Sequence, residues 1–511
     1  MNGNLRSLIN FISVSAILFY ILSLILRILA VDIGTGSIKA AVFEDNFRLS
    51  SMAKVELELG AEQDLESMYG CFVKACRAVS VDSKSKCIDA MVLSGQMHGL
   101  ACISRNGTPL TRLHTYLDIR PAVVIRFIED KIDGYRLYTE TGCPPLFIYP
   151  LAKLLWFRLS KPDLFMESKW FLSAKDYIIY KLIGEPYIDR STASGSQLLN
   201  IHSLNWNDTS LELAGVDESK LPKLYDGEKS FIELPRSIAS NLGLDSSPML
   251  FLGASDGALH SLGVGAISDG IAAVNIGTSG AFRLSSDKPV VDRSRDMRFF
   301  CYYLGYGIWI PGGAVNNAGL CLRWFRDDVL GSRCSYEELI SEAESVDLDL
   351  SNPLILPFLS GERFPVRNPY AKAVFFGLTL NHRRGHIVRA LMEAPIYTLR
   401  WIADSMKENM LKARIARIGG GGSSSKLWRK ICSSILDMRV EYVGFEESSL
   451  MGAAILAASG LGYYNSLKDA LSVAVSIADV DDPVQSEVEI YEKRYRLYHK
   501  LYDTILSLYR F

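Results

Sequence analysis

The sequence predicts an α/β protein built from two similar halves with a cleft between them. The segment AVDIGTGS at residues 30–37 recurs as AVNIGTSG at residues 273–280, close to half of the 511-residue chain away. In each copy an apolar run leads into a turn of glycine and hydroxyl residues, and a second apolar run follows, which is the pattern of a β-hairpin. Beyond the hairpins, short apolar runs alternate with longer runs of helical period. A repeated hairpin that opens each half therefore indicates a duplicated α/β domain.

Composition agrees with this fold class. At about 150 residues per domain the chain is long enough for two or more cores, and its 49% hydrophobic and 22% charged residues exclude wholesale disorder. The 55 basic and 57 acidic side chains leave no excess of positive charge for nucleic acid. Nine cysteines without a C-x-x-C pair predict free thiols in a reducing compartment. Only His382 and His386 have the spacing of two ligands on one helix face, so we expect no zinc site.

The N-terminus is the one anomaly of composition. Residues 8–26 contain no charged side chain, and this length matches a membrane span flanked by Arg6 and Arg27. A signal peptide is a second interpretation, but no small-residue cleavage site follows. Because the segment runs without a linker into a predicted buried strand at 28–33, we favour a non-native extension from a misplaced start, or a segment lying against the protein, over a membrane anchor. The predicted divisions are an extension at 1–27 and domains at 28–262 and 263–511.

Between the motifs, strands and helices are expected to alternate. The predicted strands are 28–33, 38–43, 87–93, 249–252, 281–284, 308–310 and 416–418. The predicted helices are 151–159, 174–182, 315–325, 386–410 and 427–436. Gly184 is expected to end one helix and Pro395 to kink the longest. The strand at 308–310 runs into the Pro-Gly-Gly at 311–313, which precedes a predicted helix. Tyr491, Tyr495, Tyr498, Tyr502, Ile505 and Tyr509 keep a helical period, which predicts a packed helix face.

Four glycine-rich turns at the ends of predicted strands are the candidates for chemistry, at residues 32–37, 253–258, 275–280 and 419–425. Small residues let backbone N–H groups and hydroxyls approach phosphate oxygens, although glycine also ends many strands for conformational reasons alone. The first turn has Asp32 where the second has Asn275. A carboxylate beside phosphates needs a divalent cation, so Asp32 is a candidate Mg²⁺ partner through water. Lys39 either neutralises a phosphate or is a solvated hairpin lysine.

The turn at 253–258 differs because it places a single carboxylate, Asp256, between small residues. Phosphoryl transfer to an alcohol requires an acceptor for the hydroxyl proton, and a carboxylate in a cleft provides one. The alternative is that Asp256 caps the N-terminus of a helix.

On these motifs the chain resembles the FGGY family of carbohydrate kinases from residue 28 to the C-terminus. Segments 32–39 and 275–280 resemble the family's two phosphate loops, and 419–428 resembles its adenosine loop. Asp256 falls on the catalytic base, and SGQMHG at 94–99 resembles a sugar-contacting loop. The resemblance implies two duplicated actin-like ATPase (ribonuclease H-like) domains with an interdomain cleft. It also implies Mg·ATP and transfer of the γ-phosphoryl group to a hydroxyl of a small sugar or sugar acid.

Two branches of this family compete. QMHG at 96–99 resembles the xylulokinases, whereas longer tracts resemble the gluconate kinases, namely 150–156, 253–259, 312–317, 359–363 and 375–379. Tyr116 and Ile119 depart from the family pattern, which leaves the polyol open. Asp118 and Arg120 still offer an acceptor and a forked donor, and the guanidinium suits either the carboxylate of a sugar acid or a protein carboxylate. We expect gluconate, converted to 6-phosphogluconate, with xylulose or another pentulose as the alternative.

The resemblance also implies individual site residues. The expected cofactor-binding residues are Asp32, Gly34, Thr35, Gly36, Ser37, Lys39, Gly277, Thr278, Ser279, Gly312, Gly313, Gly420, Gly421 and Ser425, with Asp32 holding Mg²⁺ through water. The expected substrate-binding residues are Gln96, Met97, His98, Asp118, Arg120 and Asp256, the last as catalytic base.

An alternative of another class is a membrane-tethered, non-catalytic nucleotide or sugar sensor. The carboxylates at Asp32 and Asp256 oppose it, because a pure binder has no need of a base. The expected partners are a small sugar or sugar acid and, as an open alternative to a monomer, a second copy of the chain in a homodimer. The dependence on ATP and the unpaired cysteines predict a cytoplasmic location.

Overall fold

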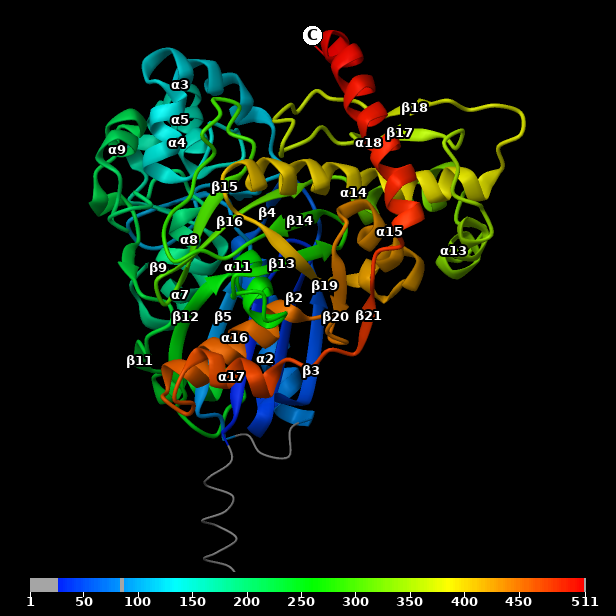
Figure 1. Ribbon diagram of the computed structural model, residues 1–511. Helices are drawn as coiled ribbons and strands as arrows, with labels where there is room; N and C mark the ends of the chain where they lie inside the picture. The colour runs from blue at the N-terminus through cyan, green and yellow to red at the C-terminus, as the bar shows by residue number, and fades with distance from the viewer. Residues whose placement is uncertain (1–25, 83–86, 510–511) are drawn as a thin grey trace, which may run out of the picture.

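A computed structural model describes residues 26–82 and 87–509, so the extension up to residue 25 lies outside the described residues. Two mixed β-sheets form the frame of the molecule (Figure 1). The first has the order β11 (Ile232–Glu233), β12 (Met249–Ser255), β5 (Ala90–Gly95), β1 (Ile28–Ile33), β2 (Ser37–Glu44), β3 (Arg48–Glu56). The second has the order β15 (Phe300–Gly305), β16 (Ile308–Val315), β14 (Gly280–Arg283), β13 (Gly270–Ile276), β19 (Ala413–Gly419), β20 (Arg439–Tyr442), β21 (Asp479–Asp481).

The two sheets repeat one pattern of strand directions. β1 is antiparallel to β2 and parallel to β5, and β13 is antiparallel to β14 and parallel to β19. A further antiparallel strand joins each hairpin, and a second parallel strand and an antiparallel edge strand follow on the other side, with β15 as an addition to the second sheet. The duplication predicted from the repeated motif is therefore confirmed.

Helices from both halves cover the first sheet. The side chains of α2 (Leu65–Asp82) and α7 (Ala174–Ile183) share a core with one face, and those of α11 (Asp256–Gly263) and α16 (Ser448–Gly460) share a core with the other. The backbones of α11 and α16 touch, because a Cβ on Gly263 would lie 1.8 Å from the Ser448 carbonyl oxygen. A Cβ on Gly452 would likewise lie 1.9 Å from the carbonyl oxygen of Leu259. A helix of the second half, α16, therefore packs directly against a helix of the first half, α11.

The second sheet packs against α14 (Arg384–Glu408), which runs through Pro395, and against α15 (Lys426–Leu436). The helix α18 (Gln485–Ile505) lies beside them (Figure 1). Its tyrosines at positions 491, 495, 498 and 502 are buried in this core, as the helical period predicted.

A helical lobe beside the first sheet contains α3 (Ile125–Lys131), α4 (Gly134–Thr141), α5 (Pro150–Ser160) and α9 (Asp208–Ala214) around a core of its own (Figure 1). The remaining helices are α6 (Pro162–Glu167), α8 (Arg190–Ser194), α10 (Arg236–Asn241), α12 (Gly319–Trp324), α13 (Tyr336–Glu344) and α17 (Leu467–Ala474). The remaining strands are β4 (Glu62–Gln63), β6 (Ala101–Ile103), β7 (Leu113–His114), β8 (Trp170–Leu172), β9 (Tyr187–Asp189), β10 (Lys223–Tyr225), β17 (Leu354–Leu356) and β18 (Val374–Phe376).

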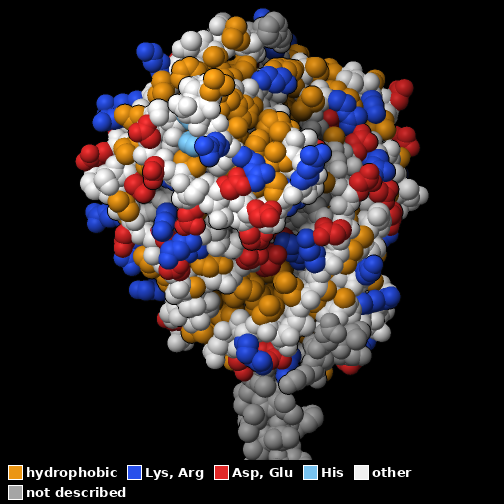
Figure 2. All heavy atoms as spheres, turned by 90° about the vertical axis from the view of Figure 1, so that its right-hand side faces the viewer, with side chains coloured by type: hydrophobic (Ala, Val, Ile, Leu, Met, Phe, Trp, Pro, Cys, Tyr) orange, Lys and Arg blue, Asp and Glu red, His pale blue; other side chains and the backbone are white. Residues whose placement is uncertain are grey.

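The β17–β18 end of the molecule carries exposed apolar side chains. They are Tyr370, Phe375, Phe376, Leu378 and Leu380. Figure 2 faces this side of the molecule and shows hydrophobic side chains gathered over its upper part. The connection between the two strands returns to the second sheet, where Asn317 Nδ2 donates to the Gly361 carbonyl oxygen at 2.7 Å. That connection brings Arg363 into the interior.

Most predicted elements form, with two corrections. The helices expected at 151–159, 174–182 and 427–436 are α5, α7 and α15, and Gly184 ends α7 with a φ of 80°. The strand expected at 308–310 is longer than predicted, because β16 continues through the Pro-Gly-Gly at 311–313 and pairs Gly312 with Arg283. Two glycines in a row let β16 pass close beneath α14, where a Cβ on Gly313 would lie 2.7 Å from Ile402. The helix expected from 315 begins only at Gly319.

Candidate active site

A backbone hydrogen bond closes each of the two repeated hairpins, across a turn of residues 34–37 in the first and a shorter turn of residues 277–279 in the second. The Gly34 N–H donates to the Ser37 carbonyl oxygen at 3.1 Å, and the Gly277 N–H donates to the Ser279 carbonyl oxygen at 3.0 Å. Beside the first turn, the carboxylate of Asp32 accepts a hydrogen bond from Ser94 Oγ at 2.6 Å. Desolvation and then the charge of Asp256 raise the pKa of Asp32 to about 6. The two carboxylates therefore belong to one site.

A cavity of about 250 Å³ lies between the halves, and we call it the interdomain cavity. It is lined by Thr35, Gln96, Met97, His98, Tyr116, Ile148, Asp256, Gly257, His260, Asn275, Ser279, Gly280, Ala281, Arg283, Phe300, Tyr302, Ala314, Arg363, Phe364 and Ser449. Both hairpin turns and the QMHG segment contribute to this lining. The structure thus brings together six of the predicted residues, namely Thr35, Gln96, Met97, His98, Asp256 and Ser279.

Asp256 is the first residue of α11 and follows directly on the buried strand β12. The helix-capping position belongs to Ser255, and the Asp256 carboxylate instead accepts from the neighbouring Gly257 N–H at 2.6 Å. Desolvation raises the pKa of Asp256, while the nearby guanidinium of Arg283 opposes this shift. A carboxylate with a raised pKa at the wall of a cavity is suited to accept a proton.

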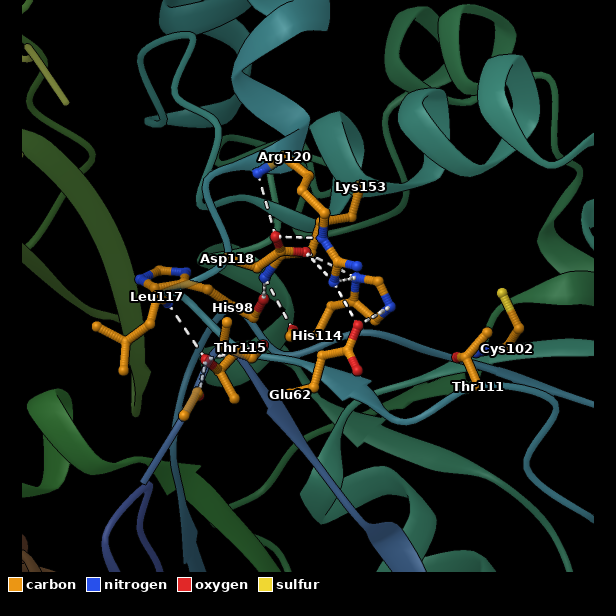
Figure 3. A network of polar contacts seen from close by, with 12 residues as sticks. Glu62, His98, Cys102, Thr111, His114, Thr115, Leu117, Asp118, Arg120 and Lys153 are labelled. Atoms are coloured by element: carbon orange, nitrogen blue, oxygen red, sulfur yellow. Dashed lines mark hydrogen bonds and ion pairs between the residues drawn. The ribbon is translucent and has the colours of Figure 1, made fainter. Parts of the chain in front are cut away.

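His98 is held rigidly in the interdomain cavity. Its backbone is left-handed, with a φ of 71°, and its Nδ1 donates to the Gly195 carbonyl oxygen at 2.8 Å. Desolvation lowers the pKa of His98 to about 3, so the ring is neutral and its Nε2 is an acceptor. The ammonium of the fully buried Lys153 donates to the carbonyl oxygens of His98 and, at 3.0 Å, His114 (Figure 3). This lysine ties the two backbone segments together.

Asp118 and Arg120 form a network of protein contacts (Figure 3). Arg120 Nε donates to Asp118 at 2.7 Å, Arg120 Nη2 donates to Glu62 at 2.5 Å, and His114 Nδ1 lies 2.7 Å from the other Asp118 oxygen. Against the effect of burial, hydrogen bonds from His114 and Arg120 hold the pKa of Asp118 below its usual range. Neither Asp118 nor Arg120 is among the described residues that line the interdomain cavity. Of the two interpretations of Arg120, the structure shows the pairing with protein carboxylates.

A second cavity of about 780 Å³ lies against the glycine-rich loop that follows β19, and we call it the glycine-loop cavity. It is lined by Gly277, Thr278, Gly319, Leu322, Arg323, Tyr336, Glu337, Ile340, Ser341, Glu344, Gly421, Gly422, Ser424, Ser425, Lys426, Leu427 and Trp428. The loop packs on the end of β13, where a Cβ on Gly420 would lie 2.4 Å from Asn275 Oδ1. Thr278 lines this cavity while the adjacent Ser279 lines the other, so one turn connects the two.

The comparison with known protein families decides what this arrangement is. The N-terminal domain of the FGGY family of carbohydrate kinases matches residues 27–263, and the family's C-terminal domain matches residues 272–461. The chain belongs to the FGGY family of carbohydrate kinases. It therefore has the two-domain, actin-like ATPase fold of that family and is a phosphotransferase with an alcohol group as acceptor.

Individual FGGY kinases resemble this one along nearly their whole length. The gluconokinase of Bacillus subtilis is 33% identical over 91% of this chain and 93% of its own. The xylulose kinase of Staphylococcus epidermidis is 26% identical over 94% of this chain and 97% of its own. Among solved structures, the gluconate kinase from Lactobacillus acidophilus superposes with a TM-score of 0.89 at 27% identity, covering 95% of this chain and 99% of that one.

Several predicted cofactor-binding residues of this FGGY kinase lie around the cavities without lining them. Gly36 is exposed at the tip of the first turn, and Gly312 and Gly313 are buried inside β16. Lys39 pairs with Glu447 of the second half, with Nζ 2.5 Å from a carboxylate oxygen. It is therefore neither an isolated solvated lysine nor free for a phosphate in this structure.

The sequence missed most of the charged and aromatic lining of the interdomain cavity. Arg283, Tyr302 and Arg363 all line it. Arg363 ends the segment 359–363, on which part of the resemblance to gluconate kinases depends, but nothing local in that segment indicates a cavity. No local sequence pattern identifies these three residues as cavity residues. Each comes from a strand or connection of the second half that meets the first half only in the folded protein.

Other expectations concern metals, disulfides and membranes. In the part of the chain that the structure describes, no cluster of three or more His, Cys, Asp or Glu residues could hold a metal ion. No disulfide joins any two of the described cysteines. Across residues 26–82 and 87–509, no helix has both the length and the apolar character needed to cross a bilayer.

Proposed function

We propose that this FGGY kinase transfers the γ-phosphoryl group of ATP to a hydroxyl of gluconate and forms 6-phosphogluconate. The observation that carries the proposal is the 33% identity with the Bacillus subtilis gluconokinase over 91% of the chain. Since ATP is the phosphoryl donor, we infer that the reaction takes place in the cytoplasm. Xylulose is the alternative substrate, because Met97 and His98 of the xylulokinase-like segment line the interdomain cavity.

The two cavities supply the parts that this reaction needs. The apolar side chains of Leu322, Ile340 and Leu427 and the small Gly421 and Ser425 of the glycine-loop cavity would hold the adenosine. The turns at residues 34–37 and 277–279 would approach the phosphates through backbone N–H groups and hydroxyls. Mg²⁺ commonly binds one or two carboxylates together with substrate phosphates, so the single carboxylate of Asp32 fits an ion held through water. Bound Mg²⁺ would neutralise charge on the phosphates.

The sugar would lie in the interdomain cavity against Gln96, Met97 and His98. Asp256 would take the proton of the attacking hydroxyl as the hydroxyl oxygen bonds to the γ-phosphorus and the bond to ADP breaks. Asp118 and Arg120 would act by fixing the segment that carries Tyr116 rather than by touching the sugar. Most of the acceleration would come from positioning and charge stabilisation.

ADP release with Mg·ATP and a panel of gluconate, xylulose, ribulose, glycerol and no sugar tests the proposal. We expect gluconate to give the highest kcat/KM. Preference for xylulose would keep the mechanism and overturn the substrate. If ATP binds but no polyol stimulates ADP release, the membrane-tethered sensor becomes the better hypothesis, and retention in washed membranes would then support it.

As the pH is lowered, kcat/KM should begin to fall at a pH that is unusually high for the protonation of carboxylates. The pKa of Asp32 is about 6 and that of Asp256 is also raised, and each group acts in its ionised form. Lowering the pH through 6 protonates Asp32, so kcat/KM should fall there rather than near 4, the usual range of aspartate. The pH profile of ADP release, with coupling enzymes in excess at each pH, measures this. A rate that stays constant down to pH 5 would contradict it.

A further inference from the structure

Two arginines that line the interdomain cavity form no ion pair with a carboxylate among the described residues, unlike the buried arginines Arg429 and Arg494. Arg429 pairs with Asp479 and Asp481, and Arg494 pairs with Glu393. Arg363 is 9% exposed, yet its described contacts are a 3.5 Å hydrogen bond from Nη2 to the Val315 carbonyl oxygen and the ring of Tyr116, 5.2 Å from Cζ. Its Nε is buried without a hydrogen-bond partner among the described residues.

Arg283 is the second of these cations. It ends β14, and its guanidinium lies over Gly257, where an added Cβ would be 2.7 Å from Nη2. Burial, together with the charge of Arg363, lowers the pKa of Arg283, whereas the charge of Asp256 raises it. The two guanidinium groups therefore share one cavity with a carboxylate that the reaction needs as a proton acceptor.

The remaining groups near these arginines do not neutralise them. Glu362 accepts from the backbone N–H groups of Asn316 and Arg363 and from the side chain of Asn317, and burial raises its pKa to about 7. His98 is neutral, and Tyr302 is held protonated by burial, which raises its pKa. Among the described residues that line the cavity, two arginines thus face a single carboxylate, that of Asp256.

An unpaired buried charge is costly, and a ligand that brings the opposite charge removes that cost. A guanidinium binds a carboxylate through two parallel N–H···O bonds, which a neutral polyol cannot offer. Arg120, the arginine that the sequence offered for this role, is already bonded to Asp118 and Glu62. Arg363 lies over the ring of Tyr116 and lines the same cavity as Gln96, Met97 and His98 of the predicted sugar-contacting loop.

We propose that Arg363, with Arg283 beside it, binds the carboxylate of a sugar acid and thereby selects this substrate class over neutral polyols and ketoses. The proposal rests on the proposed function and deepens it. The hydroxyls of the sugar acid would meet Gln96, the Nε2 of His98 and Asn275, and its terminal hydroxyl would reach Asp256. Gly257 keeps the space that the guanidinium of Arg283 fills.

The test compares Arg363→Gln and Arg363→Lys with the unaltered full chain on gluconate and on glucitol, in which a CH₂OH group replaces the carboxylate. Arg105→Gln, an exposed arginine of the first half, is the matched control. We expect Arg363→Gln to raise the KM for gluconate about 100-fold, with a smaller change in Arg363→Lys. The KM for ATP and any activity on glucitol should change less than about 3-fold, since both lack the lost contact.

The measured KM values for gluconate, glucitol and ATP show whether Arg363 binds the carboxylate of the sugar acid. A rise in the KM for ATP with an unchanged KM for gluconate would overturn the proposal and assign Arg363 to the phosphates. An equal loss on gluconate and glucitol would also overturn it. Calorimetric titration with gluconate in the absence of nucleotide gives the same comparison for a variant too slow to assay, and an unchanged melting temperature shows that the variant is folded. If the unaltered enzyme prefers xylulose, the proposed function fails, whatever the variants do.

Discussion

Replacing Asp256 by asparagine is expected to lower kcat for sugar phosphorylation by about 10²–10⁴-fold, the usual contribution of a positioned general base. The amide has the size of the carboxylate, and its oxygen can still accept the hydrogen bond from the Gly257 N–H. It cannot take a proton from the attacking hydroxyl at neutral pH. The affinity for ATP should be nearly unchanged, because Asp256 does not line the glycine-loop cavity.

Single-turnover ADP formation and calorimetric binding of a non-hydrolysable ATP analogue separate these two effects. Asp245→Asn is the matched control, since this aspartate is exposed on the same half. It should keep full activity. Near-normal turnover in Asp256→Asn would remove Asp256 from the role of base and leave Asp32 as the carboxylate to test next.

Replacing Lys175 by methionine is expected to destabilise the protein by about 3–5 kcal/mol, because it leaves a buried charge without its partner. Lys175 and Asp189 are both fully buried, with Nζ 2.6 Å from the carboxylate. The same ammonium donates to the Ala254 carbonyl oxygen at 2.9 Å, two residues before Asp256. Its loss should therefore affect both the stability of the folded state and the end of β12, which leads directly into the base.

The melting temperature measures this effect, and a fall of about 3–5 °C is expected for a loss of this size in a chain of this length. Lys181→Met, on the same helix, is the matched control. Lys181 pairs with Glu66 at the surface, with side-chain exposures of 30% and 53%, so its removal should cost less than about 1 kcal/mol. The double variant Lys175→Met/Asp189→Leu should recover much of the loss. Equal melting temperatures for Lys175→Met and Lys181→Met would show that the buried pair is not stabilising.

The hairpins, the duplication and most helices were predictable because their signals are local. A glycine-hydroxyl turn between apolar runs is the local signal of a hairpin, and the tyrosine period of α18 reports a buried face directly. The full length of β16 was not predictable, because the Pro-Gly-Gly at 311–313 locally favours a turn. In the folded protein the need to pair β16 with β14 beneath α14 outweighs that preference.

Site residues could be predicted from the sequence only where they belong to a recognised motif and themselves line the interdomain cavity. Asp256 and the QMHG segment do so. Arg363 and Arg283 could not be found in this way, since each becomes a cavity residue only when the second half meets the first. Arg120 shows the converse error: an arginine beside a recognised motif is attractive as a ligand, but its donors are taken by Asp118 and Glu62.

The contact between α11 and α16 links the geometry of catalysis to the angle between the halves. At Gly263 and Gly452 the backbones of the two helices are in direct contact, so no side chain separates them there. At the other end of α11, Ser449 of α16 donates to the Asp256 carbonyl oxygen at 3.0 Å. A rotation of the second half therefore moves the helix that begins with the base. In the proposed reaction, closing the two halves would bring ATP to the sugar and align the proton acceptor in one movement. Water that enters while the halves are apart would therefore meet a base that is out of position, and little ATP would be lost to hydrolysis.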